Sequence, residues 1–256
     1  MGMPSSPYFN EEVIRKNSSG AYGNYAVQEK MTSSGAMTKT AILSAVVAVS
    51  VFLPQIFELG NMSHGLAAGC GILGFIMVLV MVFKPEVAKY IAFPYAVCEG
   101  LFISSLVLIA NSLYPGVAFE ALIATVALLA AVGVSYKTGL IKVNEVFMSA
   151  FKLMSIAFLC LLLLNVVTIF FFKDVGTQLF SLTQSGLIGI GITLFMLVYG
   201  SFCLVLDLAT MEQGEASGAN KDFEWYCAVS LLITIVYIYI HMLRLLIQIA
   251  ATMNRD

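Results

Sequence analysis

Seven apolar runs of about 20 residues recur along this chain, and no other feature constrains its fold as strongly. An α-helix rises about 1.5 Å per residue, so one such run crosses a bilayer's hydrocarbon core of about 30 Å. Hydrophobic residues make up 60% of the sequence and charged residues 11%, which excludes a soluble globular protein. The chain is therefore predicted to be an all-α, polytopic membrane protein with seven transmembrane helices, at approximately residues 38–57, 64–83, 91–113, 117–136, 147–172, 187–209 and 223–250.

The distribution of lysine and arginine predicts the orientation of these spans. Connections one–two and three–four contain neither residue type, and connection five–six contains only Lys173. Because basic residues accumulate on the cytoplasmic side of membrane proteins, we expect a cytoplasmic N-terminus and a C-terminus outside. The residues that support this orientation precede the first span or lie in connections two–three, four–five and six–seven: Arg15, Lys16, Lys30, Lys84, Lys89, Lys137, Lys142 and Lys221.

Residues 1–37 contain no apolar run and are rich in Ser, Gly, Asn and Tyr. They lack the basic stretch followed by an apolar stretch that defines a signal peptide, so we expect a mobile cytoplasmic tail. Residues 38–250 then form one seven-helix transmembrane domain. Because no connection exceeds about 15 residues, no separate soluble domain fits between the spans. The protein is expected to act within the membrane or through its short loops, which excludes most enzyme classes.

The last span is apolar on three sides and polar on one. Its polar residues follow one another at steps of three and four, so in a helix they share one face. Polar groups that face lipid are unfavourable unless they have partners or water, so this face is expected to point into the protein. We call these residues the polar stripe: Glu224, Cys227, Ser230, Thr234, Tyr237, His241, Arg244 and Gln248.

Part of the polar stripe also repeats every seven residues, at Cys227, Thr234, His241 and Gln248. A strict heptad corresponds to 3.5 residues per turn, which keeps facing the same neighbour in a left-handed bundle. The pattern predicts that the last helix is central in the bundle and is surrounded by the other six.

Two acidic residues lie within apolar runs, and a third begins the last span. Glu99 lies about 12 Å into the third span, and Asp207 follows about twenty uncharged residues in the sixth. With Glu224, both fall in the cytoplasmic half under the predicted orientation. A carboxylate in a membrane must be paired, protonated or hydrated. The acids therefore predict either a site for a cation or proton, or a buried carboxylate tied to Lys39, Lys142 or a backbone N–H.

The other motifs argue against catalysis and against a resident cofactor. The zinc-protease motif HExxH and phosphate-binding glycine loops are absent, the last span has no second aspartate for an aspartyl dyad, and no serine and histidine lie at matching depths in the predicted spans. All five cysteines fall inside predicted spans without a CxxC pair, so neither a disulfide framework nor a metal site is indicated. His241 and Arg244, near the outer end of the last span, are interpreted as interface anchors or a salt-bridge latch.

Four segments resemble the Bax inhibitor 1 superfamily, in particular its bacterial Bax inhibitor 1-like branch. They are "MTSSGAMTKTAILS" at the first span, "PYAVCEGLF" around Glu99, "YKTGLIKVNEVF" before the fifth span, and the segment "DLATMEQGEASGANKDFEWYCAVSLLITIVYIYIHMLRLL" that begins at Asp207. The resemblance covers about residues 31–250. It implies seven spans with the last enclosed by the others, and a location in a bacterial plasma (inner) membrane.

The resemblance also implies a function and a site. Members of the superfamily are described as pH-sensitive calcium leak channels, and some as modulators of stress responses, cell death or membrane-bound protease activity. Their leak site uses two aspartates, of which Asp207 matches the first. The second aligns near Thr234, which is not an acid, and the second span has no arginine that could pair with the carboxylate. If this protein senses pH, Glu99 or Glu224 is the candidate for the second role.

Three hypotheses for the function follow. The leading one is a pH-modulated calcium (cation) leak channel or a regulator of ion homeostasis, with Asp207 as the gate and the polar stripe lining or plugging the route. It requires no cofactor beyond transient calcium. The second is a non-conducting protein that binds a membrane-bound protease or another membrane partner through the tail 1–37 or the loop 210–221. The third is a proton-coupled transporter of a small solute. The expected partners are the lipid bilayer and calcium or protons, and none is a nucleic acid.

Overall fold

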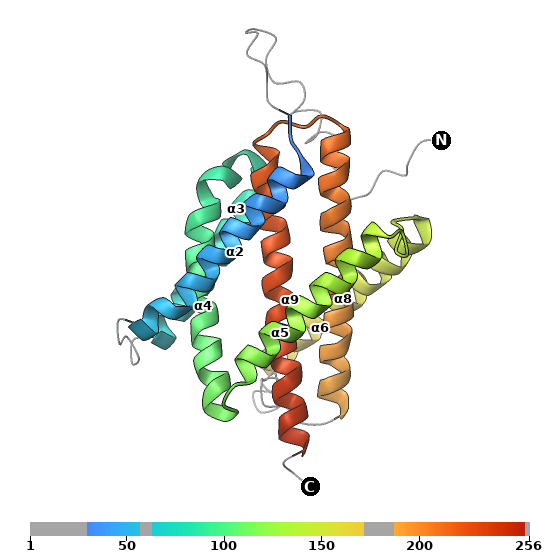
Figure 1. Ribbon diagram of the computed structural model, residues 1–256. Helices are drawn as coiled ribbons and strands as arrows, with labels where there is room; N and C mark the ends of the chain where they lie inside the picture. Colours follow the sequence, from blue (N-terminus) through green and yellow to red (C-terminus); the bar gives the residue numbers. More distant parts are fainter. Residues whose placement is uncertain (1–29, 57–62, 172–186, 254–256) are drawn as a thin grey trace. The chain divides into compact units, whose positions relative to one another are not determined.

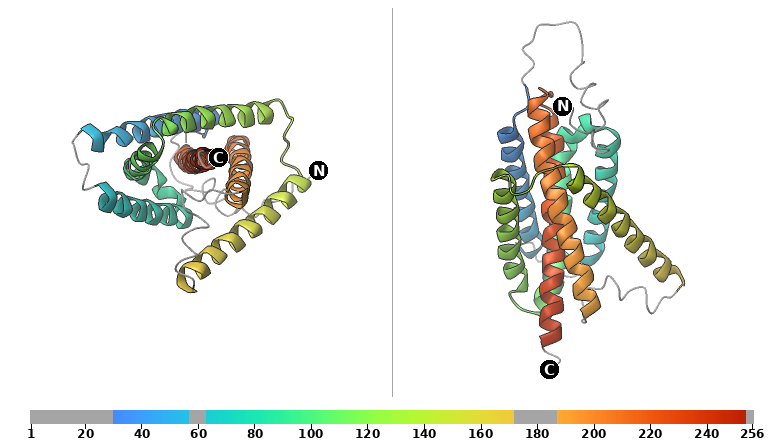
Figure 2. Two further views of the ribbon diagram at one scale, coloured as in Figure 1. Left: turned by 90° about the horizontal axis from the view of Figure 1, so that it is seen from below. Right: turned by 90° about the vertical axis from the view of Figure 1, so that its right-hand side faces the viewer.

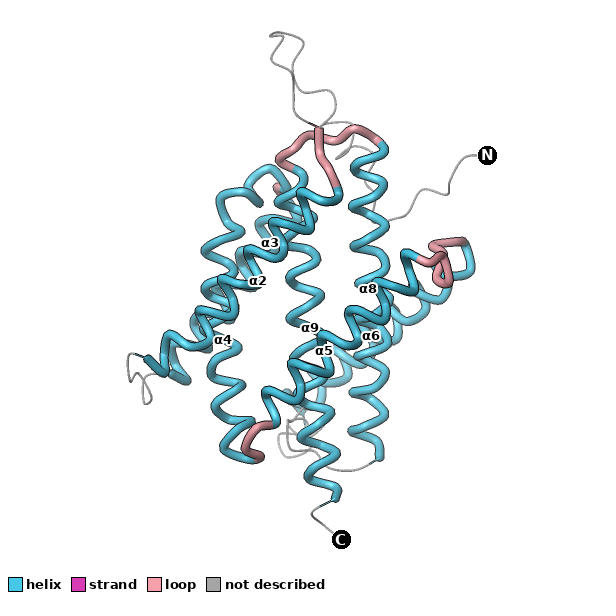
Figure 3. The backbone as a smooth tube through the Cα atoms, viewed as in Figure 1, coloured by secondary structure: helices cyan, strands magenta, loops and turns pink. Residues whose placement is uncertain are grey.

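The computed structural model describes residues 30–56, 63–171 and 187–253 (Figure 1). Among these residues the regular structure is helical, without β-strands (Figure 3), and one isolated antiparallel bridge joins Lys30 to Asn220. A short 3-10 helix, Pro85–Val87, precedes α4. The α-helices of the described residues are α2 (Ser33–Ile56), α3 (Ser63–Phe83), α4 (Ala88–Leu113), α5 (Val117–Lys137), α6 (Glu145–Phe171), α8 (Leu187–Ala216) and α9 (Phe223–Met253).

Each of the seven predicted spans coincides with one of these helices. Six of them are long and apolar enough to cross a membrane, and the described apolar stretch of the remaining one, Ala67–Phe83 in α3, is shorter. The chain is therefore an all-α polytopic membrane protein, as predicted. Of the predicted N-terminal tail, residues 1–29 lie outside the described residues.

Two helix ends differ from the predicted span limits by more than three residues. The first helix begins at Ser33, before the apolar run itself. The sixth span continues as α8 to Ala216, so more than two helical turns follow Asp207. This extension consists largely of strong helix formers, which keep the helix intact after the apolar run ends. Gly218, with φ of 67°, then terminates α8 in a Schellman motif, in which the Ala219 N–H donates to the Gly214 carbonyl.

The chain divides into two compact units, and α8 and α9 contribute to both. The first unit contains the residues up to Leu108 together with Asp207–Ile233. The second contains Ile109–Leu206 together with the residues from Thr234 onwards.

In the first unit, the beginning of α9 contacts three helices. It reaches α2 and α8 through polar groups described below, and α4 through Trp225, whose ring centroid lies 5.6 Å from that of Phe93. Helices α2 and α4 approach closely at Gly100, where a Cβ atom would lie 2.7 Å from the Val47 carbonyl oxygen and closer still to Ser50 Cβ. Only glycine fits this crossing without a shift of the backbone.

In the second unit, the rest of α9 packs against α8 and α5. The Tyr237 hydroxyl donates to the Met196 sulfur of α8 (3.3 Å), and the Tyr239 hydroxyl donates to the Ala118 carbonyl of α5 (3.4 Å). Helix α6 is steeply inclined to α8 (Figure 2) and meets it through stacked rings, with centroids of Phe147 and Phe202 4.7 Å apart.

Burial distinguishes the last helix from the others. Half of the most apolar stretch of α9 is buried, against 6% for α6. Between Phe223 and Ala250 only Ile249 is classed as exposed. Few positions of α9 are exposed on any side, as expected of a helix that packs against protein, whereas few positions of α6 are buried, as expected of a helix that faces lipid.

Candidate functional site

Asp207 lies on α8 and faces α9. Its carboxylate accepts a hydrogen bond from the Ser230 hydroxyl at 2.7 Å. Tyr226 and Cys227 of α9 lie within electrostatic range of the same carboxylate. Asp207 is partly exposed. The structure thus brings together the acid of the sixth span and a residue of the polar stripe, which the sequence placed on separate helices.

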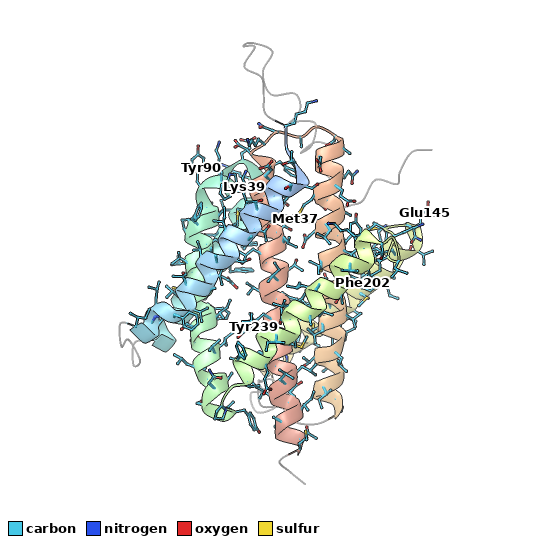
Figure 4. The ribbon with its side chains drawn as sticks, in the orientation of Figure 1. Met37, Lys39, Tyr90, Glu145, Phe202 and Tyr239 are labelled. Atoms are coloured by element: carbon cyan, nitrogen blue, oxygen red, sulfur yellow. The ribbon has the colours of Figure 1, made fainter. Side chains whose placement is uncertain are left out.

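Glu224, at the start of α9, forms a buried ion pair. Its carboxylate lies 2.7 Å from the ammonium of Lys39, which projects from α2 (Figure 4). The Glu224 side chain is 3% exposed and that of Lys39 is 17% exposed. The ammonium also lies 4.7 Å from the centre of the Trp225 ring, a cation–π contact. The interpretation of a carboxylate tied to Lys39 therefore applies to Glu224.

The N-terminus of α2 supplies the remaining partners of the Glu224 carboxylate. Thr32 donates to it through its backbone N–H at 2.9 Å and its hydroxyl at 3.3 Å. The Thr32 hydroxyl oxygen also caps the helix by accepting the Gly35 N–H at 3.0 Å. A helix N-terminus attracts negative charge, so the position stabilises an ionised carboxylate. A Cβ atom at Gly35 would lie 2.5 Å from the Glu224 carboxylate, which explains why glycine occupies this turn.

The segment before α2 is fastened to the connection between α8 and α9. The Met31 N–H donates to the Ala219 carbonyl at 2.8 Å, and the Met31 side chain is 1% exposed. The Ser33 N–H donates to the Glu215 carboxylate at 3.1 Å. These contacts, together with the Glu224–Lys39 pair, fix the first turns of α2 against the end of α8 and the start of α9.

Glu99 occupies a separate acidic position on α4. It hydrogen-bonds with Tyr95, one turn earlier on the same helix. Helix α3 approaches it at Gly74, where a Cβ atom would lie 3.5 Å from the Glu99 carboxylate. The side chain of Glu99 is partly buried.

The later part of the polar stripe, from Thr234 onwards, lies in the second unit and forms a different set of contacts. The His241 ring packs on Tyr237 with centroids 4.1 Å apart, and its Nδ1 lies 2.9 Å from the Tyr237 carbonyl oxygen. Gln248 is fully buried and accepts a hydrogen bond from the Thr193 hydroxyl at 2.9 Å. Arg244 is also buried, at 4% exposed. No residue of the polar stripe is classed as exposed, which agrees with a stripe that points into the protein.

A family model described as Bax inhibitor 1 like matches residues 6–251. The chain belongs to this family. The match covers almost the whole sequence and includes every helix described above except the last two residues of α9. A comparison with curated proteins gave no match, and neither did a comparison with solved structures.

In this Bax inhibitor 1-like protein, Thr234 stands where the resemblance implies a second acid. Thr234 is 7% exposed and lies one helical turn beyond Ser230 on the same face of α9. Within the described residues, no group of three or more His, Cys, Asp and Glu side chains is arranged to hold a metal ion. The carboxylates that the structure places along this face are instead Asp207, through Ser230, and Glu224.

Several site residues of the Bax inhibitor 1-like chain could not be identified from the sequence. Thr32, Gly35 and Glu215 lie in segments that look like ordinary polar connections, and Thr193 is a single hydroxyl in an apolar run. One local signal was available, because Thr followed by small polar residues ahead of an apolar run is typical of a helix N-cap. It predicts the cap of α2 but not the carboxylate that the cap binds.

Proposed function

We propose that this integral membrane protein is a pH-modulated calcium (cation) leak channel or a regulator of ion homeostasis, with no enzymatic activity. The observation that carries the proposal is the contact between the Asp207 carboxylate and Ser230 inside the membrane-spanning part of the chain. Membership of the Bax inhibitor 1-like family supports it. The proposal keeps a cytoplasmic N-terminus, an outer C-terminus and a bacterial inner membrane, so Asp207 and Glu224 would face the cytoplasmic side.

The physical basis is the charge of the Asp207 carboxylate. The hydroxyl of Ser230 is neutral, so its hydrogen bond leaves the charge in place and an ionised Asp207 attracts a cation. Protonation removes the charge and converts the carboxylate into a hydrogen-bond donor. The groups of α9 that face it, Ser230, Tyr226 and Cys227, would then repack around a neutral side chain. This change at the α8–α9 contact is the proposed route by which pH modulates the leak.

The test is calcium flux into proteoliposomes that contain the purified protein. Asp207→Asn keeps the size of the side chain and removes its charge, and it should lower the flux about tenfold or more. Glu120→Gln is the matched control, because Glu120 is an exposed acid at the start of α5. Unchanged flux in Asp207→Asn would remove Asp207 from the pathway.

A second candidate function is a non-conducting regulator that binds a membrane-bound protease or another membrane partner. The end of α8 and the following turn favour it, because Glu212, Gln213 and Ser217 are exposed to solvent. Pull-down from membranes separates the two functions. Loss of every partner on deletion of residues 1–29, with no calcium flux in the intact protein, would favour the regulator.

A further inference from the structure

We infer that Lys39 controls the access of cations to the carboxylates of Asp207 and Glu224. Its ammonium is a counter-ion that lies beside Glu224, where a cation would otherwise bind. The inference rests on the proposed function, because it assigns to one residue the electrostatic control of that pathway. It goes further than the proposed function because it names the residue that sets the net charge near Asp207.

Two residues of the N-terminal part of the chain, Lys39 and Thr32, satisfy the Glu224 carboxylate in different ways. The Glu224 carboxylate is satisfied by the ammonium of Lys39 and by the two donors of Thr32, at 2.7, 2.9 and 3.3 Å. Thr32 is fixed in place because its hydroxyl caps α2. Lys39 is a long side chain that reaches the carboxylate from the second turn of the helix. Lys39 is also the more exposed partner. A cation that enters from solvent therefore meets the ammonium before it reaches the carboxylate.

The Glu224–Lys39 ion pair lies close enough along α9 to influence the charge at Asp207. Glu224 and Ser230 are six residues apart on α9, which corresponds to a rise of about 9 Å along the helix. Cys227 lies between them and is within electrostatic range of both carboxylates. A unit charge at about 9 Å in a protein environment changes the occupancy of a monovalent cation about tenfold. The net charge of the Glu224–Lys39 pair therefore changes the electrostatic potential at Asp207.

Removal of the two charges of the ion pair, one at a time, should change the attraction for cations in opposite directions. Removal of the Lys39 charge leaves two carboxylates near Cys227 and should increase the attraction for cations. Removal of the Glu224 charge leaves an ammonium near Asp207 and should repel them. A purely structural ion pair behaves differently, because loss of either partner damages the same packing and would change the flux in the same direction.

The experiment compares calcium flux in proteoliposomes for the two halves of the pair. Because calcium is divalent and feels the same charge twice as strongly, Lys39→Met should raise the flux by at least about tenfold, and Glu224→Gln should lower it by a similar factor. The double variant with both substitutions should return close to wild type, and Lys39→Arg should match wild type. Lys89→Met is the control, because Lys89 pairs with Asp222 at 2.6 Å in an exposed ion pair of the same unit.

A second measurement covers the case in which Lys39→Met folds poorly. Calcium should raise the thermal stability of the detergent-solubilised Lys39→Met variant more than that of wild type, since only the variant adds a Glu224 carboxylate without its counter-ion. The inference is overturned if both single variants shift the flux in the same direction, or if calcium stabilises Lys39→Met no more than wild type. Flux that is insensitive to Asp207→Asn would instead overturn the proposed function.

Discussion

Replacing Gly100 by alanine should destabilise the protein by about 1–3 kcal/mol. The added Cβ atom would lie 2.7 Å from the Val47 carbonyl oxygen and closer still to Ser50 Cβ, so α2 and α4 must move apart. Backbone atoms of a packed helix cannot rotate away as the end of a long side chain can. The expected result is a clear loss of thermal stability in detergent, measured by the temperature dependence of the monodisperse fraction.

The matched control is Gly133→Ala in α5. Both glycines lie inside a helix, and a Cβ atom at Gly133 meets no atom within 4 Å. Alanine has the higher helix propensity, so this substitution should be neutral or stabilise the protein by up to about 1 kcal/mol. Equal effects at the two positions would show that the α2–α4 crossing is looser than the structure indicates.

The second large effect concerns the Glu224–Lys39 ion pair, and it should be asymmetric. Lys39→Met leaves a carboxylate that is 3% exposed without its countercharge, and breaking a buried ion pair in this way costs about 3–5 kcal/mol. Glu224→Gln leaves an ammonium that is 17% exposed and can turn towards solvent, so it should cost less. Because the double variant buries no unpaired charge, it should recover part of the loss.

A double-mutant cycle on thermal stability measures this coupling. The stability effects of both single substitutions have the same sign, whereas their effects on calcium flux are expected to be opposite. Additive single-variant effects would mean that the two side chains contribute independently and that the pair does not act as a unit.

The membrane helices could be predicted from the sequence because bilayer thickness sets a minimum length for an apolar run. The polar stripe could be predicted for a similar reason, since the period of a helix converts residue spacing into a face. The ends of the helices were predicted less accurately, because helix propensity as well as hydrophobicity determines where a helix ends. Helix α8 continues past Asp207 to Ala216 because its strong helix formers persist after the apolar run ends.

The partners of the acidic residues could be predicted only in part. The sequence identifies Asp207 and Glu224 as unusual and names Lys39 as a possible partner for a buried acid, but it does not indicate which acid Lys39 meets. Thr32 is 192 positions away from Glu224 in the chain, and contacts of that separation are fixed by how the helices pack. Gly35 becomes informative only once the carboxylate is seen above it.

The most direct test of the central claim, that Asp207 is the titrating carboxylate of a calcium pathway, is the pH profile of calcium flux. Flux should be measured in proteoliposomes from neutral to mildly acidic pH for wild type, Asp207→Asn and Glu99→Gln. Wild-type flux should change with pH, Glu99→Gln should keep this dependence, and the residual flux of Asp207→Asn should be independent of pH. An Asp207→Asn variant with the wild-type pH profile would contradict it.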